Sequence, residues 1–283
     1  MRPSSCDEQR LGDLLAAGKA DLLYTWCMSA APLLIIVTGD PIAQTREHIG
    51  SFANMVRAGL VGTWDGGYVV LDARVKCAEW PPVEDFAGVI ITGSASSVTE
   101  RAPWMLRLER YLAGAVDGGQ AVLGICFGHQ ILGQALGGLV QRNPRGREMG
   151  TVMLTILRDD VLLDRSIEPS LVHVTHVDSI EVLPRGAEVL AATEVEPHAA
   201  VRFGDRAWGL QFHPEFDVRI MTDYVQARAD LLAGEGKNPA AVLADIKVAR
   251  VGNMALRRFV ERGVLAHTRG PRSEGFGEGR RQS

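Results

Sequence analysis

Four short, mostly apolar runs constrain the fold of this chain more than any other feature of its sequence. They lie at 33–37 (LLIIV), 68–72 (YVVLD), 88–92 (GVIIT) and 121–126 (AVLGIC), and a helix-like mixture of polar and apolar residues fills 44–58. Strands that are apolar along their length and alternate with helices are typical of a parallel sheet covered on both faces. The sequence therefore predicts an α/β core.

Further elements are expected on either side of residue 150. A helix is expected at 103–117, with Pro103 in its first turn, and another at 127–136, closed by two glycines. After Gly150 the apolar segments become shorter, which predicts antiparallel or mixed strands added to the core. These strands are expected at 152–157, 171–175, 188–191, 199–203 and 208–212, followed by helices at 218–232 and 239–262.

The two ends of the chain are expected to lie outside the core. Residues 22–39 carry no charge over 18 positions, which is long enough for a membrane span, but Pro32 interrupts a helix there. We therefore interpret 33–37 as a strand and expect no membrane association. The predicted organisation is an N-terminal extension at 1–32, a main domain at 33–235, a C-terminal helical segment at 236–268 and a disordered Gly- and Arg-rich tail at 269–283.

The composition excludes several classes of protein. Of 283 residues, 46% are hydrophobic and 23% charged, as in globular proteins. The net charge of −4 is too balanced to indicate a nucleic-acid-binding protein. Cys6, Cys27, Cys77 and Cys126 show no short regular spacing, which argues against a disulfide framework or a four-cysteine zinc site. A globular protein of the cytoplasm is expected.

The segment around Cys126 carries the strongest chemical signal. A hydrophobic strand ends there in the pattern G-x-C-x-G, formed by Gly124, Cys126 and Gly128, and a helix follows at once. This is the arrangement of a nucleophile elbow, in which a sharp strand-to-helix turn exposes the reactive side chain. The positive end of the helix dipole favours a thiolate at this position. By itself the pattern also fits a buried, inert cysteine.

His213, Pro214 and Glu215 supply partners for such a thiol. A predicted strand runs into His213 and stops at Pro214. Residues two apart in an extended chain face the same side, so Glu215 is expected beside His213. A carboxylate on one imidazole nitrogen leaves the other nitrogen free to exchange a proton with a thiol. The segments together predict a Cys-His-Glu arrangement.

Other polar clusters admit other interpretations. Cys126 with His129, and His173 with His176, resemble zinc ligand pairs, but residues three apart on a strand face opposite sides. The serine-rich segment 93–97 resembles a phosphate loop but lacks the Lys-Ser/Thr that would follow it. We therefore expect no bound metal.

Three arginines, Arg142, Arg145 and Arg147, form a small basic segment near the expected pocket. Such a segment is most often a solvated loop, and a role in carboxylate recognition is the alternative.

Residues 124–130 (GICFGHQ) and 213–215 (HPE) resemble the class I glutamine amidotransferase family, in particular the glutaminase domain of GMP synthetase and its free-standing relatives. The likeness extends over roughly 33–224 and includes, in matching order, 90–94, 103–104, 146–150 and 175–178. It implies a flavodoxin-like, doubly wound, mostly parallel sheet with added antiparallel strands.

The same resemblance implies roles for individual residues. Cys126 would be the nucleophile, His213 the general base and acid, and Glu215 the carboxylate that orients the histidine. The backbone N–H groups of Gly93, Ser94 and Phe127 would form the oxyanion hole. The glutamine pocket would be lined by Gln130, Thr175, His176 and Asp178. The family chemistry needs no cofactor.

The leading functional hypothesis is hydrolysis of the γ-amide of glutamine through a cysteine thioester. The sequence shows no ATP-binding phosphate loop of the GMP synthetase type, so the ammonia would pass to a separate synthase subunit or another acceptor. The alternatives are hydrolysis of γ-glutamyl peptides and a catalytically inactive scaffold. The intact Cys126, His213 and Glu215 argue against the scaffold.

Overall fold

The computed structural model describes residues 31–76 and 80–268, and its elements belong to the unit that begins at Pro32. The expected extension up to residue 30, the tail from residue 269 and Cys77 lie outside these described residues. Within the described ranges no helix has both the length and the apolar character needed to cross a bilayer. The apolar stretch before Gly39 instead ends in strand β1 (Leu33–Val37), as expected.

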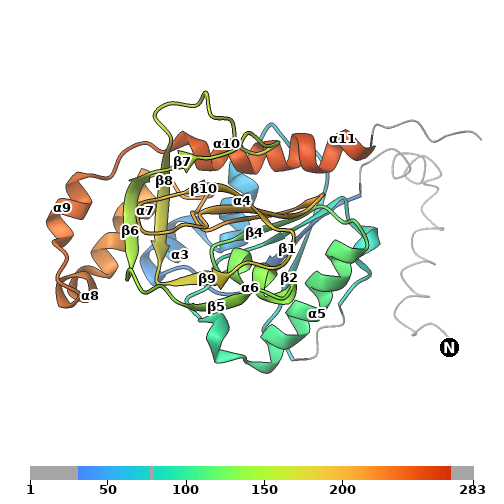
Figure 1. Cartoon of the computed structure of the whole chain (residues 1–283), viewed down its shortest axis with the longest axis horizontal. Helices are drawn as coiled ribbons and strands as arrows, with labels where there is room; N and C mark the ends of the chain where they lie inside the picture. The colour runs from blue at the N-terminus through green and yellow to red at the C-terminus, as the bar shows by residue number, and fades with distance from the viewer. Residues whose placement is uncertain (1–30, 77–79, 269–283) are drawn as a thin grey trace, which may run out of the picture. The chain divides into compact units, whose positions relative to one another are not determined.

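An eight-stranded sheet forms the centre of the unit, in the order β2-β1-β3-β4-β12-β11-β10-β7 (Figure 1). The first five strands in this order are parallel, and the other three are antiparallel additions. The order 2-1-3-4 is that of a doubly wound, flavodoxin-like sheet, so the expected fold class is confirmed. The strands after β1 are β2 (Tyr68–Asp72), β3 (Gly88–Ile91), β4 (Val122–Ile125), β7 (Thr155–Ile156), β10 (Glu188–Ala192), β11 (Ala200–Gly204) and β12 (Ala207–Leu210).

Helices cover both faces of the parallel part, which is why its strands are continuously apolar. Leu33 and Ile35 of β1 point to the face covered by α4 (Phe52–Gly59) and α10 (Arg250–Arg258). Leu34 and Ile36 point to the opposite face, which is covered by α5 (Pro103–Asp117) and α6 (Phe127–Ala135). Figure 1 shows α10 and α5 on opposite sides of the strands. Alternate side chains are therefore buried in separate apolar layers.

Two separate antiparallel ribbons stand beside this sheet. The first pairs β5 (Leu139–Arg142) with β9 (Asp178–Val182), and the second pairs β6 (Glu148–Met153) with β8 (Leu171–His176). Neither β5 nor β9 was expected, because both carry polar residues and lack a continuous apolar run. The single strand expected at 152–157 is wrong: it divides at Leu154, whose N–H donates to Ser170 and leaves β6 and β7 in different sheets.

The long helices expected from periodicity are also divided. The segment 44–58 forms α3 (Ala43–Ile49) and α4, because Gly50 adopts φ 96° and the Ser51 side chain caps α4 by accepting from the N–H of Asn54. The segment 239–262 is likewise interrupted. The remaining helical elements are η1 (Val83–Asp85), η2 (Val98–Glu100), α7 (Val218–Ala227), α8 (Ala229–Gly234), α9 (Pro239–Ala244), the π-helical η3 (Phe259–Val264) and α11 (Leu265–Thr268).

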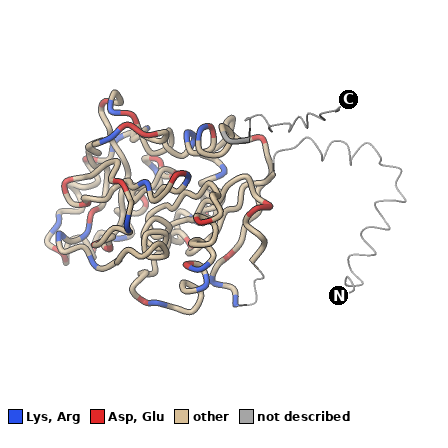
Figure 2. The backbone as a smooth tube through the Cα atoms, turned by 45° about the vertical axis from the view of Figure 1, so that its right-hand side comes forward, with Lys and Arg blue, Asp and Glu red and all other residues tan. Residues whose placement is uncertain are grey.

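Charged side chains pair locally rather than gathering on one face. Figure 2 shows Lys and Arg interspersed with Asp and Glu along the described chain. Arg74 illustrates the pattern, since its guanidinium lies 2.7 Å from a carboxylate oxygen of Asp72 and 2.8 Å from one of Asp40. The charge on Asp40 is therefore already compensated.

The turn from β4 into α6 explains the G-x-C-x-G pattern. A Cβ on Gly124 would lie 2.3 Å from the carbonyl oxygen of Gly128, and a Cβ on Gly128 would lie 2.4 Å from the carbonyl oxygen of Ile91. Both separations are too short for any side chain. The two glycines therefore let the first turn of α6 rest directly on β3 and β4, with Cys126 held between them.

We predict that Gly128→Ala destabilises the fold through this contact. The added methyl group must displace the backbone of β3, and overpacking of a core typically costs about 1–3 kcal/mol. The control is Gly114→Ala, in an exposed turn of α5 where a Cβ would meet no atom within 4 Å. That change is expected to add about 1 kcal/mol by helix propensity. Urea denaturation measures both, and equal free energies of unfolding for the two variants would contradict the prediction.

Candidate active site

Cys126 occupies a strained position at the carboxyl end of β4. It is the residue before the first turn of α6 and adopts φ 51° and ψ −102°, outside the conformations that L-residues favour. Its backbone N–H donates to the carbonyl of Leu210 at 2.8 Å, which ties the turn to β12. The side chain is buried, with 6% of the residue exposed. Strain of this kind, held in place by neighbouring strands, is characteristic of functional sites.

His213 and Glu215 form a buried pair, as the sequence predicted. The ring Nδ1 lies 2.9 Å from Oε1 of Glu215, and both side chains are at most 3% exposed. The backbone N–H of His213 donates to the carbonyl of His173, and its ring stacks on Phe216 at 4.1 Å between centroids. These contacts fix the orientation of the imidazole and leave Nε2 free of the carboxylate.

The electrostatic surroundings of His213 favour its protonated form. Burial lowers the pKa of the ring, but the charges of Glu215 and Cys126, with the hydrogen bond to Glu215, more than offset it and raise the pKa to about 10. The protonated ring therefore faces both a carboxylate and the sulfur of Cys126. Burial lowers the pKa of His173 to about 4, although the charge of Asp217 acts in the opposite direction.

The loop after β3 passes close to both Cys126 and His213. A Cβ on Gly93 would lie 3.0 Å from Cε1 of His213 and 3.7 Å from Cβ of Cys126. The hydroxyl of Ser94 donates to the carbonyl of Thr38 at 2.9 Å, which anchors this loop to the end of β1. Phe127 begins α6, where backbone N–H groups have no partner within the helix. The three residues predicted as oxyanion donors thus lie in the segments next to Cys126.

Cys126 lies where two hollows meet. The first, of about 390 Å³, is called here the polar hollow, and the second, of about 230 Å³, the aromatic hollow. The shared wall is Ser94, Ala95, Cys126, Thr175 and Arg228. The polar hollow adds Ser96, Ser97, Thr99, Gln130, Arg142, Arg147, His176, Val177 and Asp178. The aromatic hollow adds Asp40, Pro41, Ile42, Phe52, His213 and Tyr224.

The predicted substrate-binding residues all line the polar hollow. Gln130 donates from Nε2 to the carbonyl of Asp178 and to Oε1 of Gln211, both at 2.9 Å. The carboxylate of Asp178 accepts from the hydroxyl of Ser97. Among the described residues the buried hydroxyl of Thr175 has no hydrogen-bond partner. Gln130 and Asp178 are thus held in place, and Thr175 presents an unused polar atom.

His176 is fixed by a buried network behind the same wall. Its Nε2 lies 3.2 Å from Oε2 of Glu148, and its Nδ1 lies 3.1 Å from the carbonyl of Asp178. The other oxygen of Glu148 accepts from the hydroxyl of Thr193 at 2.7 Å. Glu148, which sequence reasoning did not single out, therefore joins β6 to the end of β8 and to Thr193, the residue after β10.

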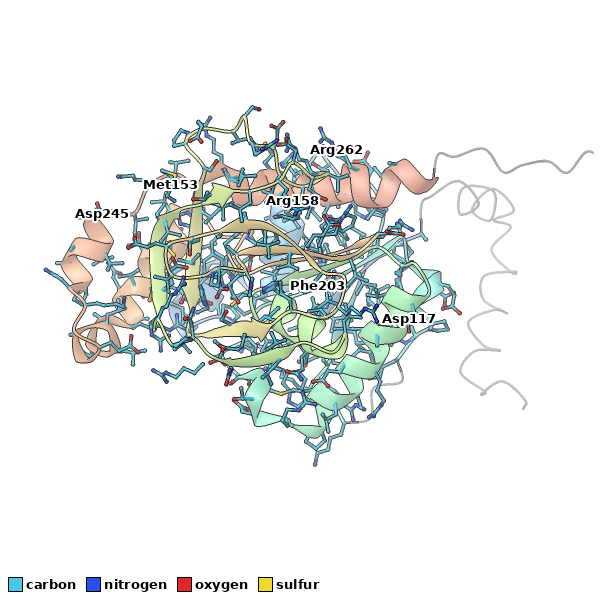
Figure 3. The ribbon with its side chains drawn as sticks, in the orientation of Figure 1. Asp117, Met153, Arg158, Phe203, Asp245 and Arg262 are labelled. Carbon is cyan, nitrogen blue, oxygen red and sulfur yellow. The ribbon has the colours of Figure 1, made fainter. Side chains whose placement is uncertain are left out.

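The histidines considered as zinc ligands each contact different residues. His129 is fully buried against Gly209 and Phe203 (labelled in Figure 3), and burial lowers its pKa to about 3. It therefore stays neutral within the core. His173 contacts the hydroxyl of Thr151, whereas His176 contacts Glu148.

The arginines divide between the hollow and the surface. Arg142 and Arg147 line the polar hollow, while the exposed side chain of Arg145 donates to the carbonyl of Glu194. Sequence reasoning missed Tyr224 and Arg228, which line the aromatic hollow. Their spacing of four, in the helical segment after Glu215, was the available signal, because residues four apart lie on one face of a helix.

Comparisons with known proteins place this geometry in a family. The model of the class I glutamine amidotransferase family matches residues 69–228. A GMP synthase [glutamine-hydrolyzing] of Porphyromonas gingivalis is 39% identical over 130 residues, which cover 45% of this chain and 24% of that protein. The chain thus spans about a quarter of the GMP synthase. Gamma-glutamyl peptidase 5 of Arabidopsis thaliana is 31% identical over 166 residues, 56% of this chain and 66% of that one.

Solved structures share the fold. A glutamine amidotransferase of Thermotoga maritima superposes with a TM-score of 0.67 at 23% identity, covering 83% of this chain and 98% of that one. The family model spans more than half of the chain and includes Cys126, His213 and Glu215. The chain belongs to the class I glutamine amidotransferase family.

Proposed function

We propose that this protein hydrolyses the γ-amide of a γ-glutamyl group, with glutamine as the simplest substrate, through a thioester on Cys126. The observation that carries the proposal is the strained thiol at the meeting point of two hollows, beside an imidazole whose other nitrogen is held by Glu215. A nucleophile, a base and an orienting group in this order are what acyl transfer requires.

The reaction would proceed in two halves. The sulfur of Cys126 attacks the γ-carbonyl carbon, and the proton of His213 passes to the leaving nitrogen as the C–N bond breaks. Water then gives a proton to His213 and attacks the thioester, and glutamate leaves as the C–S bond breaks. Backbone N–H groups of Gly93, Ser94 and Phe127 would hold the oxyanion in both halves, at about 3 kcal/mol for each donor.

The raised pKa of His213 suits the first half. At neutral pH the ring carries a proton, so the attacking sulfur is paired with a cation and a proton is available for the amine. Glu215 stabilises that imidazolium from the side opposite the thiol.

The polar hollow would bind the amino-acid end of the γ-glutamyl group. Its Asp178 carboxylate suits an α-ammonium, and Arg142 and Arg147 suit an α-carboxylate. Gln130 would act by holding the backbone of Asp178. Complementary charges of both signs in one hollow support a zwitterionic substrate.

Two fates of the released amine remain as candidates. With glutamine the product is ammonia, which we propose passes to a separate synthase subunit; the likeness to GMP synthases, of which this chain spans only about a quarter, supports this candidate. The second candidate is a γ-glutamyl peptide hydrolase. The aromatic hollow beside His213 favours it, because ammonia alone leaves that space unused.

Cys126→Ala is expected to abolish hydrolysis of glutamine, because the nucleophilic atom is lost. The Tm should change by no more than about 4 °C, corresponding to about 1 kcal/mol. Ammonia release and thermal unfolding measure the two effects. Cys77→Ala serves as the matched control and should retain turnover. A glutamine-mimicking electrophile should label Cys126 in preference to Cys77. More than a few per cent residual activity in Cys126→Ala would contradict the assignment.

Glu215→Gln is expected to shift the pH profile as well as to lower the rate. In the parent enzyme, activity should fall on the alkaline side as His213 loses its proton toward about pH 10. Removing the charge of Glu215 leaves burial less opposed, so the pKa falls and the alkaline limb moves to lower pH. The pH dependence of kcat/KM measures this for the coupled Cys126–His213 pair. The exposed Glu181→Gln is the control, and an unmoved limb in Glu215→Gln would remove Glu215 from the site.

A further inference from the structure

The position of His213 determines on which side of Cys126 the amine leaves. The group that protonates the leaving nitrogen must lie within hydrogen-bond reach of it. His213 lines the aromatic hollow and is absent from the lining of the polar hollow, where Gln130 and Asp178 lie. If the γ-glutamyl group occupies the polar hollow, its leaving nitrogen faces the aromatic hollow. Any substituent on that nitrogen then enters the aromatic hollow.

The walls of the aromatic hollow are shaped for such a substituent. Phe52, Tyr224 and Ile42 supply apolar surface in a space of about 230 Å³. Phe216 packs behind them, 4.8 Å from the ring of Tyr224 and 6.5 Å from that of Phe52, which makes the wall rigid. Burial raises the pKa of Tyr224, so its phenol stays protonated.

Among the described residues around this hollow, Arg228 is a cation that forms no ion pair with a carboxylate. The carboxylate of Asp40 is already bonded to Arg74 at 2.8 Å and lies 3.4 Å from Arg46. Arg147, on the far side of the shared wall, is paired with Glu235 at 3.1 Å. Among the described residues, none accepts a hydrogen bond from the buried Nη1 of Arg228.

The side chain of Arg228 is held in place by a neighbouring ring. Its guanidinium lies over the ring of Tyr224, 4.8 Å from the centroid, and burial lowers its pKa. An unpaired, partly buried guanidinium offers two parallel N–H donors and is best satisfied by a carboxylate. The hollow therefore combines an apolar wall, an unpaired cation and an adjacent proton donor.

We propose that the aromatic hollow is a leaving-group site for amino acids, in which Arg228 binds the carboxylate of the departing residue. The substrate class would be γ-glutamyl amides of α-amino acids or short peptides, and Arg228 would determine specificity for the leaving group. The inference rests on the proposed function, because it needs the thioester chemistry of Cys126. In the step concerned the C–N bond breaks, the nitrogen takes the proton of His213, and the free amino acid departs with its carboxylate on Arg228.

Two substrates that differ in one carboxylate test the proposal. The kcat/KM of γ-glutamylglycine is compared with that of γ-glutamylmethylamide, which has a similar amide but no carboxylate, and glutamine is measured alongside. The parent enzyme is expected to prefer γ-glutamylglycine at least tenfold, about 1.4 kcal/mol. In Arg228→Met this ratio should fall to about one. In Arg228→Lys it should be intermediate, because the charge remains and the bidentate geometry is lost.

Arg145→Met is the matched control. It removes a nearby positive charge that lies outside both hollows, and it should keep the parental ratio. Thermal unfolding of each variant shows whether it is folded, and Arg228→Lys keeps the test informative if Arg228→Met is not.

The possible failures are distinct. A parent enzyme that hydrolyses all three substrates without preferring the carboxylate, or an Arg228→Met variant that keeps the preference, overturns the leaving-group site and leaves the proposed function standing. Equal losses on all three substrates in Arg228→Met would show that Arg228 serves the γ-glutamyl half or the fold. A parent enzyme that hydrolyses none of them contradicts the proposed function itself.

Discussion

The backbone contact between α6 and the strands beneath it sets the position of Cys126 relative to the ends of the neighbouring strands. Because Gly124 and Gly128 lack side chains, the first turn of α6 sits on β3 and β4 at a distance that no other residue allows. Cys126 is thereby held at the carboxyl end of β4. In a parallel sheet the neighbouring strands end at the same edge, and β3 and β12 flank β4 on its two sides.

The segments that follow these three strands bring Gly93, Cys126 and His213 close together. The residues after β3 bring Gly93 against the imidazole, β4 ends at Cys126, and the residues after β12 bring His213. Leu210 of β12 pairs in register with Ile125 of β4, so thiol and imidazole follow from adjacent positions of the sheet. The geometry of the candidate site is thus set by the register of the sheet.

Much of this could be predicted from the sequence, because its signals are local. An apolar run such as LLIIV predicts a strand buried on both faces, and G-x-C-x-G predicts a sharp turn without knowledge of any distant residue. The ribbon strands β5 and β9 could not be predicted, since their polar residues are stabilised by pairing with each other. The break at Gly50 depends on a positive φ that periodicity does not reveal.

The candidate site likewise contains some residues that could be predicted from the sequence and others that could not. The contact of His213 with Glu215 was predicted from an extended backbone. The contact is present, but residues 214–215 form a turn, in which the N–H of Phe216 donates to the carbonyl of His213. The buried network of His176 and Glu148 joins segments 28 residues apart and needs the fold to be seen. The spacing of four from Tyr224 is the one local signal for Arg228, and it does not reveal that Nη1 has no hydrogen-bond partner among the described residues.

The two antiparallel ribbons and the eight-stranded sheet contribute different residues to the candidate site. They form sheets of their own, apart from the eight-stranded sheet that carries Cys126 and His213. Thr175, His176 and Asp178 therefore belong to segments outside that sheet, and the two are linked where the carbonyl of His173 in β8 accepts a hydrogen bond from the N–H of His213. A two-stranded ribbon is marginally stable by itself, so side-chain anchors such as Glu148 keep it in place. The link between His173 and His213 uses backbone atoms, so substitutions of ribbon side chains can change the lining of the polar hollow while leaving the link in place, which makes that lining the part of the candidate site most open to evolutionary change.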